Sequence, residues 1–249
     1  MNDGNPVDSL IGYWNIRYSQ CVTSPFPHFI HSDDQPLFLA NPKLCAAVPQ
    51  PPIESETIAP GFHLSLQPVP YMGDIRRADI FLLMTNPVVR REDYCDNENQ
   101  KFTEALRENI GGVRKTCLAW DTEGVGETSW TRYYRNEVLG PTVRDYPEMS
   151  ERLKTRLAIL ELVPYYSSNA RCITDKLLAA LPSVQVAKRA AKYLEERANK
   201  GEAHLIVRWR NGCKRWGVCE DGDNIVHSPA RRGLSQCAKV RLLEWLEHE

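Results

Sequence analysis

The sequence predicts an α/β protein, a three-layer sandwich around a small, mostly parallel central sheet. Ile80 to Met84 form an unbroken apolar run, and a second run begins at residue 157. Short runs of this kind are typical of strands buried on both faces. Both end before a proline, Pro87 or Pro164, which has no N–H for a sheet ladder. Segments with helical apolar spacing separate the runs, and strands that alternate with helices imply parallel pairing through right-handed crossovers.

The first part of the chain has a different character. We expect one domain over residues 1–249, in which residues 1–70 form an irregular, proline-rich N-terminal arm with one short helix or strand inside 5–21. Prolines are frequent between residues 24 and 70, and they interrupt both helices and sheets. We expect a solvated acidic turn rather than a metal site at four polar residues of this arm, His28, His31, Asp33 and Asp34.

Beyond the first strand, apolar residues recur at helical spacing in several segments. Gly111 and Gly201 follow two of these segments, as glycines commonly follow helices. Ser235 is placed to cap the last helix. The predicted helices cover residues 97–110, 128–139, 148–154, 169–181 and 183–200 and the segment after Ser235, and further strands cover 203–209 and 224–226.

Composition limits the classes of function. The net charge of -1 argues against a surface that binds polyanions throughout, although a local basic face is enough to hold a few phosphates. No apolar run approaches the ~20 residues of a membrane span, and the first residues lack the pattern of a secretory signal. None of the eight cysteines belongs to a C-x-x-C pair, so the usual zinc-ribbon and ferredoxin spacings are missing. We expect a cytoplasmic monomer with reduced thiols, no metal and no other cofactor.

Three predicted strands place polar residues at their carboxyl ends: Asn86, Glu161 and His227. Carboxyl ends of parallel strands meet at one edge of the sheet, where ligands bind in open α/β folds. Each residue also has a structural explanation. Asn is common in turns before proline, Glu161 has possible ion-pair partners in Arg156 and Arg208, and His227 can bond a nearby carbonyl. The pattern predicts a site at this edge without defining its chemistry.

Two short motifs at this edge resemble those of the uracil-DNA glycosylase superfamily, and the order of elements is similar from about residue 70 to the end. Thr85-Asn86-Pro87 looks like the first motif, in which the mismatch-specific and single-strand-selective branches carry a water-positioning residue. His227-Ser228-Pro229-Ala230-Arg231-Arg232-Gly233-Leu234-Ser235 looks like the second, a loop that reaches into the minor groove and supplies a catalytic histidine. The resemblance implies that fold, with Asn86 and His227 as catalytic residues. In character it is closest to the bacterial anti-phage branch that removes glucosylated hydroxymethylcytosine.

The resemblance also bears on the substrate. Glu161 falls where uracil-removing members have an Asn that reads the base, and a carboxylate accepts from cytosine N4 but repels O4 of uracil. Val88 stands where those members have a tyrosine that rejects C5 substituents, so it leaves space for a bulky group. Tyr94 or Phe102 is a candidate to stack on a flipped base. These four residues are the predicted base-recognition set.

The loop before the last helix is the predicted DNA-binding segment. Arg231 and Arg232, with backbone N–H groups at the helix start, are suited to hold a phosphate. Leu234 or an arginine is suited to wedge into the gap left by a flipped nucleotide, and Ser235 completes the set. A solvated surface loop is the structural alternative.

The sequence thus predicts a monofunctional DNA glycosylase that uses water to release a modified cytosine from double-stranded DNA, such as phage DNA. No lysine lies at a predicted strand end to form a Schiff base, so a lyase step is not expected. Three alternatives remain: a uracil or mismatched-thymine glycosylase, a non-catalytic sensor of modified DNA, and a small-molecule hydrolase on a generic doubly wound sheet.

Overall fold

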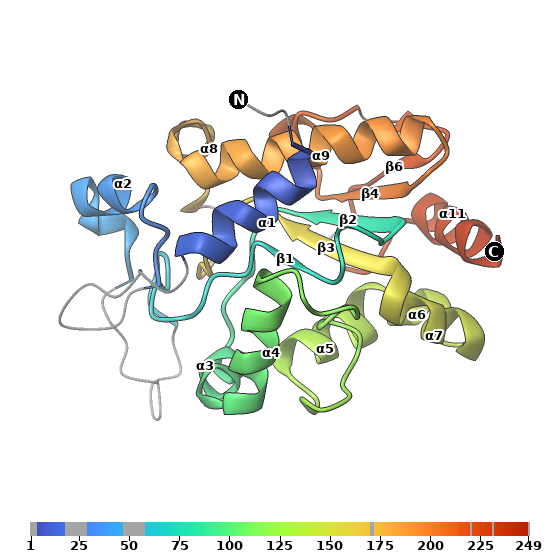
Figure 1. The fold of residues 1–249 in the computed structure, drawn as a ribbon, viewed down its shortest axis with the longest axis horizontal. Helices are drawn as coiled ribbons and strands as arrows, with labels where there is room; N and C mark the ends of the chain where they lie inside the picture. Colours follow the sequence, from blue (N-terminus) through green and yellow to red (C-terminus); the bar gives the residue numbers. More distant parts are fainter. Residues whose placement is uncertain are drawn as a thin grey trace.

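A computed structural model of the chain describes residues 4–17, 29–46, 58–169, 172–219, 221–230 and 232–248. Within these ranges one six-stranded sheet has the order β1-β3-β2-β4-β6-β5 (Figure 1). The strands are β1 (Tyr71–Met72), β2 (Ile80–Met84), β3 (Leu157–Glu161), β4 (His204–Arg208), β5 (Asp221–Gly222) and β6 (Ile225–Ser228). The four central strands run parallel, and β1 and β5 pair antiparallel at the two edges. The sheet is therefore mostly parallel, as predicted.

β2 lies at the centre of the sheet, and all five of its residues are buried. Leu82 lies beside Ile159 of β3 and Ile206 of β4, so apolar residues form continuous rows across the strands. The other predicted strands correspond to β3, β4 and β6. β1 and β5 were not predicted, because two residues are too few to show a periodic pattern.

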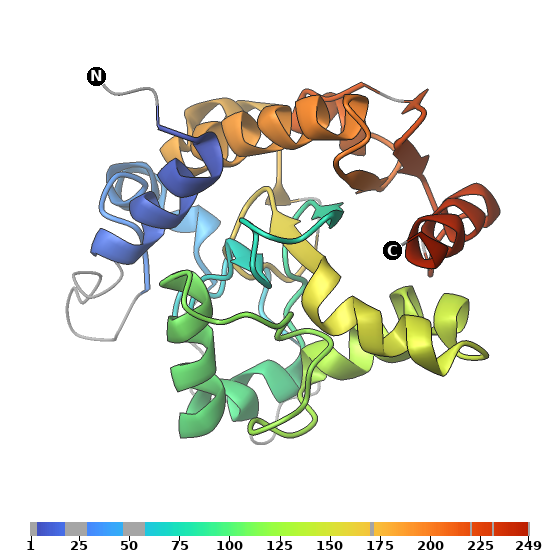
Figure 2. The ribbon, with the colours of Figure 1, turned by 45° about the vertical axis from the view of Figure 1, so that its right-hand side comes forward.

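Helices lie on both sides of the sheet, an arrangement compatible with the predicted three-layer sandwich (Figures 1 and 2). One side carries α1 (Pro6–Arg17), α8 (Asp175–Ala180) and α9 (Pro182–Asn199), and the other carries α4 (Gln100–Ile110), α5 (Ser129–Arg132) and α7 (Pro147–Arg156). α11 (Gln236–Glu247) packs against β6 and α7. Shorter helical segments are α2 (Gln35–Ala40), η2 (Pro42–Leu44), α3 (Arg91–Glu98), the π-helix η3 (Tyr133–Val138), α6 (Gly140–Val143) and α10 (Gly212–Trp216). No helix in the described ranges is both long and apolar enough to cross a bilayer.

Three predicted helices differ from those observed. The segment 128–139 forms the short α5 and then the π-helix η3. The segment 97–110 divides at Asn99, whose side chain accepts from the N–H groups of Lys101 and Phe102 and so begins α4 as a new helix. The segment 169–181 becomes α-helical only at residue 175, after the Thr174 cap. The helix predicted over 183–200 matches α9, and Gly201 follows it with a φ of 75°.

The described parts of the N-terminal arm are more regular than predicted, because they contain α1, α2 and η2. The expectation of a solvated acidic turn is wrong, since His31 and Asp34 are buried; His28 lies outside the described residues. Asp34 accepts hydrogen bonds from the Tyr165 hydroxyl (2.6 Å) and the backbone N–H of Ser183 (3.1 Å). Asp34 therefore joins the arm to the start of α9.

Replacing Asp34 with Ala should lower the free energy of unfolding by about 1–3 kcal/mol, because it leaves two buried donors without an acceptor. Urea unfolding followed by circular dichroism measures the change. Asp33→Ala, in the same turn but more exposed, is the control and should stay within about 0.5 kcal/mol of the parent protein. Equal losses in the two variants would show that the Asp34 bonds add nothing.

Candidate functional site

The order of the strands defines where a ligand is expected. β3 lies on one side of β2 and β4 on the other, so the connections that leave the carboxyl ends of these strands diverge. A crevice forms at such a switch point, outside the carboxyl ends of the strands. The structure has a cavity of about 280 Å³ there, which Met84 and Asn86 line from β2, Glu161 from β3 and Trp209 from β4. This volume is near the lower end of the range of about 300–1,000 Å³ for small-molecule pockets.

Asn86 lines the cavity as predicted, and its carboxamide has a fixed orientation. Its Nδ2 donates to the Pro87 carbonyl (2.9 Å) and to the Ser167 hydroxyl (2.7 Å). A carbonyl oxygen can only accept, so the carboxamide nitrogen of Asn86, and not its oxygen, must face the Pro87 carbonyl. No described residue donates to Oδ1, the atom that remains to bind a water or a ligand donor.

Glu161 also lines the cavity, and it is almost completely buried. The Tyr134 hydroxyl donates to its Oε1 (3.3 Å), whereas Oε2 has no hydrogen-bond partner among the described residues. Burial raises the pKa of Glu161 well above its usual value, against smaller lowering effects of Tyr134 and Arg208. Burial thus favours the protonated form of this carboxyl, which can donate as well as accept. The exclusion of uracil rests on an ionised Glu161 that only accepts, and it stays a prediction; a protonated Glu161 would also accommodate an acceptor such as O4.

Arg208 is a buried cation beside this carboxyl. Met84 of β2 lies next to Glu161 of β3. Arg208 ends β4, the strand on the other side of β2, so all three residues lie at the carboxyl edge of the sheet. Arg208 donates to the Tyr133 hydroxyl and to the Ala230 carbonyl, both at 3.3 Å, and its Nε has no partner among the described residues. In the described part of the chain neither Arg156 nor Arg208 forms an ion pair with Glu161. Arg156 pairs instead with Asp79 at the opposite edge of the sheet.

Asp93 is a second buried carboxyl group that lines the cavity. It accepts from the backbone N–H of Arg90 at the start of α3 (2.5 Å) and from the Ser129 hydroxyl of α5 (2.5 Å). Burial raises the pKa of Asp93 to about 6, with the hydrogen bond from Ser129 as the largest opposing influence. Asp93 is therefore largely ionised at neutral pH.

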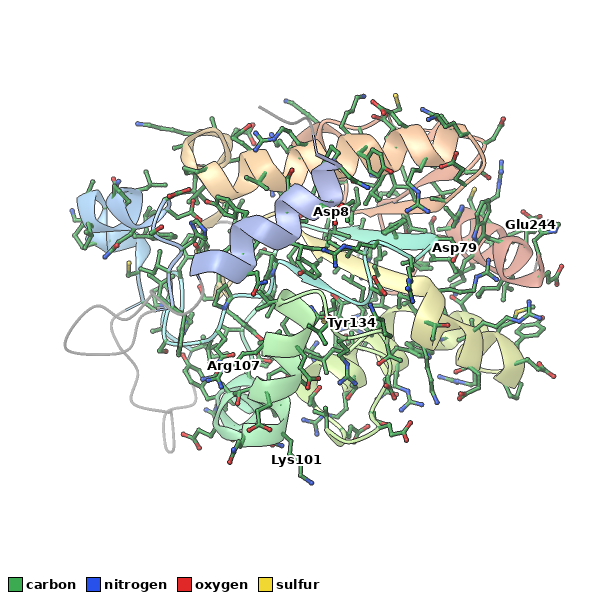
Figure 3. All side chains as sticks on the ribbon, viewed as in Figure 1. Asp8, Asp79, Lys101, Arg107, Tyr134 and Glu244 are labelled. Atoms are coloured by element: carbon green, nitrogen blue, oxygen red, sulfur yellow. The ribbon has the colours of Figure 1, made fainter. Side chains whose placement is uncertain are left out.

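Aromatic side chains form the remaining walls, and they come from α5, η3 and the end of β4: Trp130, Tyr133, Tyr134 and Trp209. The π-helix places Tyr133 and Tyr134 side by side on the cavity (Figure 3 labels Tyr134). π-Helical turns are rare and frequently occur at functional sites. Trp209 has a φ of 75°, unusual for a residue with a side chain, and such strain also concentrates at functional sites.

Charged residues surround the opening. Arg90 forms an ion pair with Glu137 (3.1 Å) and lies over the Tyr133 ring. Arg232 lines both the cavity and an adjoining hollow, which it shares with Trp209, Arg210 and Pro229. Val88 lines the cavity and is 46 % exposed, consistent with open space beside it.

Three predicted site residues lie elsewhere. His227 does not line the cavity: its Nε2 donates to the carbonyl of Trp209 (2.7 Å), the structural alternative stated above. His227 lies beside Val207 in the sheet, and Ser228 lies beside Arg208. Because successive strand residues face opposite sides of a sheet, the His227 side chain points away from the side that Arg208 faces. Phe102 is buried in the hydrophobic core, and the Tyr94 hydroxyl contacts His63 instead of the cavity.

Only some residues of the predicted DNA-binding loop are placed to contact DNA. Arg232 lines the cavity, while Arg231 lies outside the described residues. The predicted phosphate contact of Arg232 stays a prediction. Leu234 is 5 % exposed and packs in the core, so it is not placed to act as a wedge. Ser235 caps α11 by accepting from the N–H of Ala238. Its own N–H donates to the Ser228 hydroxyl.

Several residues of the site were not predicted: Asp93, Ser129, Trp130, Tyr133, Tyr134, Arg208 and Trp209. Arg208 alone had a signal in the sequence, because it ends an apolar run in the same way as Glu161. Ser129, Trp130, Tyr133 and Tyr134 lie in the helix predicted over 128–139, and Trp209 ends a predicted strand, but neither pattern indicates that these side chains face a cavity. Among the residues described, no group of three or more His, Cys, Asp or Glu side chains is arranged to hold a metal ion.

The fold and the site define an α/β protein with an aromatic, carboxyl-lined cavity at its topological switch point. Comparison of the chain with protein-family models, curated proteins and solved structures finds no match in any of the three. The resemblance to the uracil-DNA glycosylase superfamily thus remains a prediction from two short motifs.

Proposed function

We propose that this protein is a monofunctional DNA glycosylase that hydrolyses the N-glycosidic bond of a modified cytosine, such as glucosylated hydroxymethylcytosine in phage DNA. The observation that carries the proposal is the orientation of Asn86. Its Nδ2 is held by two acceptors, and its Oδ1 is free of protein donors in a cavity with aromatic walls. An enzyme of this class acts in the cytoplasm as a monomer without a cofactor.

Asn86 holds the attacking water. Glycosidic cleavage has an oxocarbenium-like transition state, in which positive charge develops on the sugar. A carboxamide oxygen orients a water toward this charge and is too weak a base to remove its proton early. The described lining of the cavity contains no lysine, in keeping with water rather than an amine as the nucleophile.

The aromatic walls suit a flipped base, which stacks between flat side chains while its edge is read by hydrogen bonds. As a neutral acid, Glu161 accepts the N4–H of cytosine at one oxygen and donates to N3 from the other. The exposed side chain of Val88 leaves room for a substituent at C5. Arg210 and Arg232 line the hollow beside the cavity, where they are suited to contact phosphates.

A second candidate, uracil excision, is favoured by one observation. A protonated Glu161 also pairs with uracil, by accepting from N3–H and donating to O4. Selection between the two bases then depends on the space beside Val88 and on the groups that line it.

The test is an abasic-site assay on four duplexes that contain uracil, a G·T mismatch, hydroxymethylcytosine or glucosylated hydroxymethylcytosine. Alkali-sensitive strands should appear with a modified cytosine, and their absence with uracil would separate the first candidate from the second. If all four duplexes stay intact after alkali, glycosylase activity is excluded for these bases, and a binding or small-molecule function remains. An unmodified duplex is the control.

A further inference from the structure

Two carboxyl groups line the same cavity in unlike environments: Asp93 accepts two hydrogen bonds, which favour an ionised carboxylate, whereas Glu161 accepts one and its Oε2 has no partner among the described residues, which favours a protonated acid. Glu161 comes from the end of β3 and Asp93 from α3. The buried Tyr166 lies within electrostatic range of both. Enzymes assign acid and base roles to paired groups in this way, because the protonated member donates while the ionised member accepts.

We propose that Glu161 is the general acid that protonates the departing base and that Asp93 is the general base that receives the proton of the attacking water. The inference rests on the proposed glycosylase function and adds two catalytic residues to Asn86. It replaces His227 as the group that assists the departing base.

The protons balance over one turnover, with one return step through solvent. As the bond between C1′ and N1 breaks, its electron pair moves onto the base, and the Oε2 proton of Glu161 passes to N3, so the base departs neutral. The water held by Asn86 bonds to C1′ through its oxygen and gives one proton to Asp93. A proton returns from Asp93 to Glu161 through solvent, and the sum is hydrolysis by one water.

The surroundings of Glu161 suit a general acid, whose carboxylate form must be stabilised until a proton returns. Oε2 is buried and has no partner among the described residues, an unsatisfied position that a base bound in the cavity would fill, and Oε1 already accepts from Tyr134. Once the proton has left, Arg208 is the nearby cation that opposes the negative charge. Tyr133 and Tyr166 are the other titratable groups close enough to Glu161 for its charge to raise their pKa values.

The surroundings of Asp93 suit a base. Each of its oxygens accepts one protein hydrogen bond, so a second lone pair on each remains for a substrate water. Within α3, Asp96 raises the pKa of Asp93, whereas Arg90 lowers it. Tyr94 and Tyr166 also lie in electrostatic contact with Asp93. From α5, the Ser129 hydroxyl lowers the pKa by its hydrogen bond.

The experiment is the pH dependence of single-turnover abasic-site formation by the full chain. The rate should rise with pH through a midpoint of about 6, the pKa of Asp93, and fall again at high pH as Glu161 loses its proton. Asp93→Asn should lower the rate at pH 7 by about 10²-fold and abolish the acid limb. Glu161→Gln should lose about 10²-fold and the alkaline limb, while DNA affinity measured by fluorescence anisotropy is retained.

Two further variants separate catalysis from structure. Ser129→Ala keeps the Asp93 carboxylate but removes a hydrogen bond that lowers its pKa, so the acid midpoint should move upward by about one pH unit. Asp96→Asn is the matched control, because Asp96 is on the same helix and accepts from the N–H of Ser129 without lining the cavity. It removes a neighbouring negative charge, so the midpoint should stay in place or move slightly down.

The possible outcomes are distinguishable. An active parent protein whose acid limb is unchanged in both Asp93→Asn and Ser129→Ala would overturn the role of Asp93. A Glu161→Gln variant with parent rates would overturn that of Glu161. A parent protein that cleaves none of the modified duplexes would instead overturn the proposed function, and the acid–base pair with it.

Discussion

Asn86→Ala should lower the rate of abasic-site formation by about 10²–10³-fold, the usual effect of removing one fixed polar group that acts on the transition state. The affinity for DNA should be nearly unchanged, because the loss concerns a water rather than a phosphate or base contact. Single-turnover kinetics and anisotropy titrations of the same preparations measure the two quantities. A defect in rate with intact binding is the signature of transition-state stabilisation.

Two other variants make this result specific. Asn211→Ala removes an exposed carboxamide in the loop after β4 and should leave the rate unchanged. Ser167→Ala removes one of the two acceptors that orient Asn86, and an intermediate loss of about 10-fold is expected when a catalytic group is less well positioned. If Asn86→Ala and Asn211→Ala have the same rate, Asn86 has no part in the reaction.

Gly140→Ala should destabilise the protein by about 3 kcal/mol. A β-carbon at Gly140 would lie 1.5 Å from the carbonyl oxygen of Arg135, so the backbone at the end of the π-helix would have to move. For a chain of this size the loss corresponds to about 6–12 °C in Tm. Differential scanning calorimetry measures it.

The same variant should also weaken ligand binding, because the π-helix carries three residues of the cavity, Tyr133, Tyr134 and Glu137. Gly12→Ala is the control. Gly12 lies in α1 with no atom within 4 Å of a β-carbon, so alanine should leave Tm unchanged or raise it slightly through its better helix propensity. An unchanged Tm in Gly140→Ala would contradict the close contact in the structure.

The sequence was informative where burial leaves a strong periodic or continuous pattern. The apolar run of β2 and the helical face of α9 carry enough residues to be recognised, and both formed as predicted. The helix predicted over 97–110 was divided because one side chain, Asn99, caps a new helix more favourably than it extends the old one. Such a choice depends on local hydrogen bonds that a periodic pattern does not contain.

For the candidate site, the sequence located Asn86 and Glu161 at the end of their strands, and both line the cavity. It failed for His227 because the side-chain direction in a strand changes with every residue, and a motif does not fix that register. It missed Asp93 because the burial that raises its pKa is produced by tertiary packing with α5.

The bond between His227 and Trp209 determines how a substitution at position 227 would act on the cavity. A ring nitrogen that faces a carbonyl oxygen must carry a proton, and Nε2 carries one in both the neutral and the charged ring. His227 therefore holds the Trp209 carbonyl whether or not the imidazole is charged. A substitution at position 227 would therefore reach the cavity only through Trp209, whose backbone with a φ of 75° this bond helps to hold.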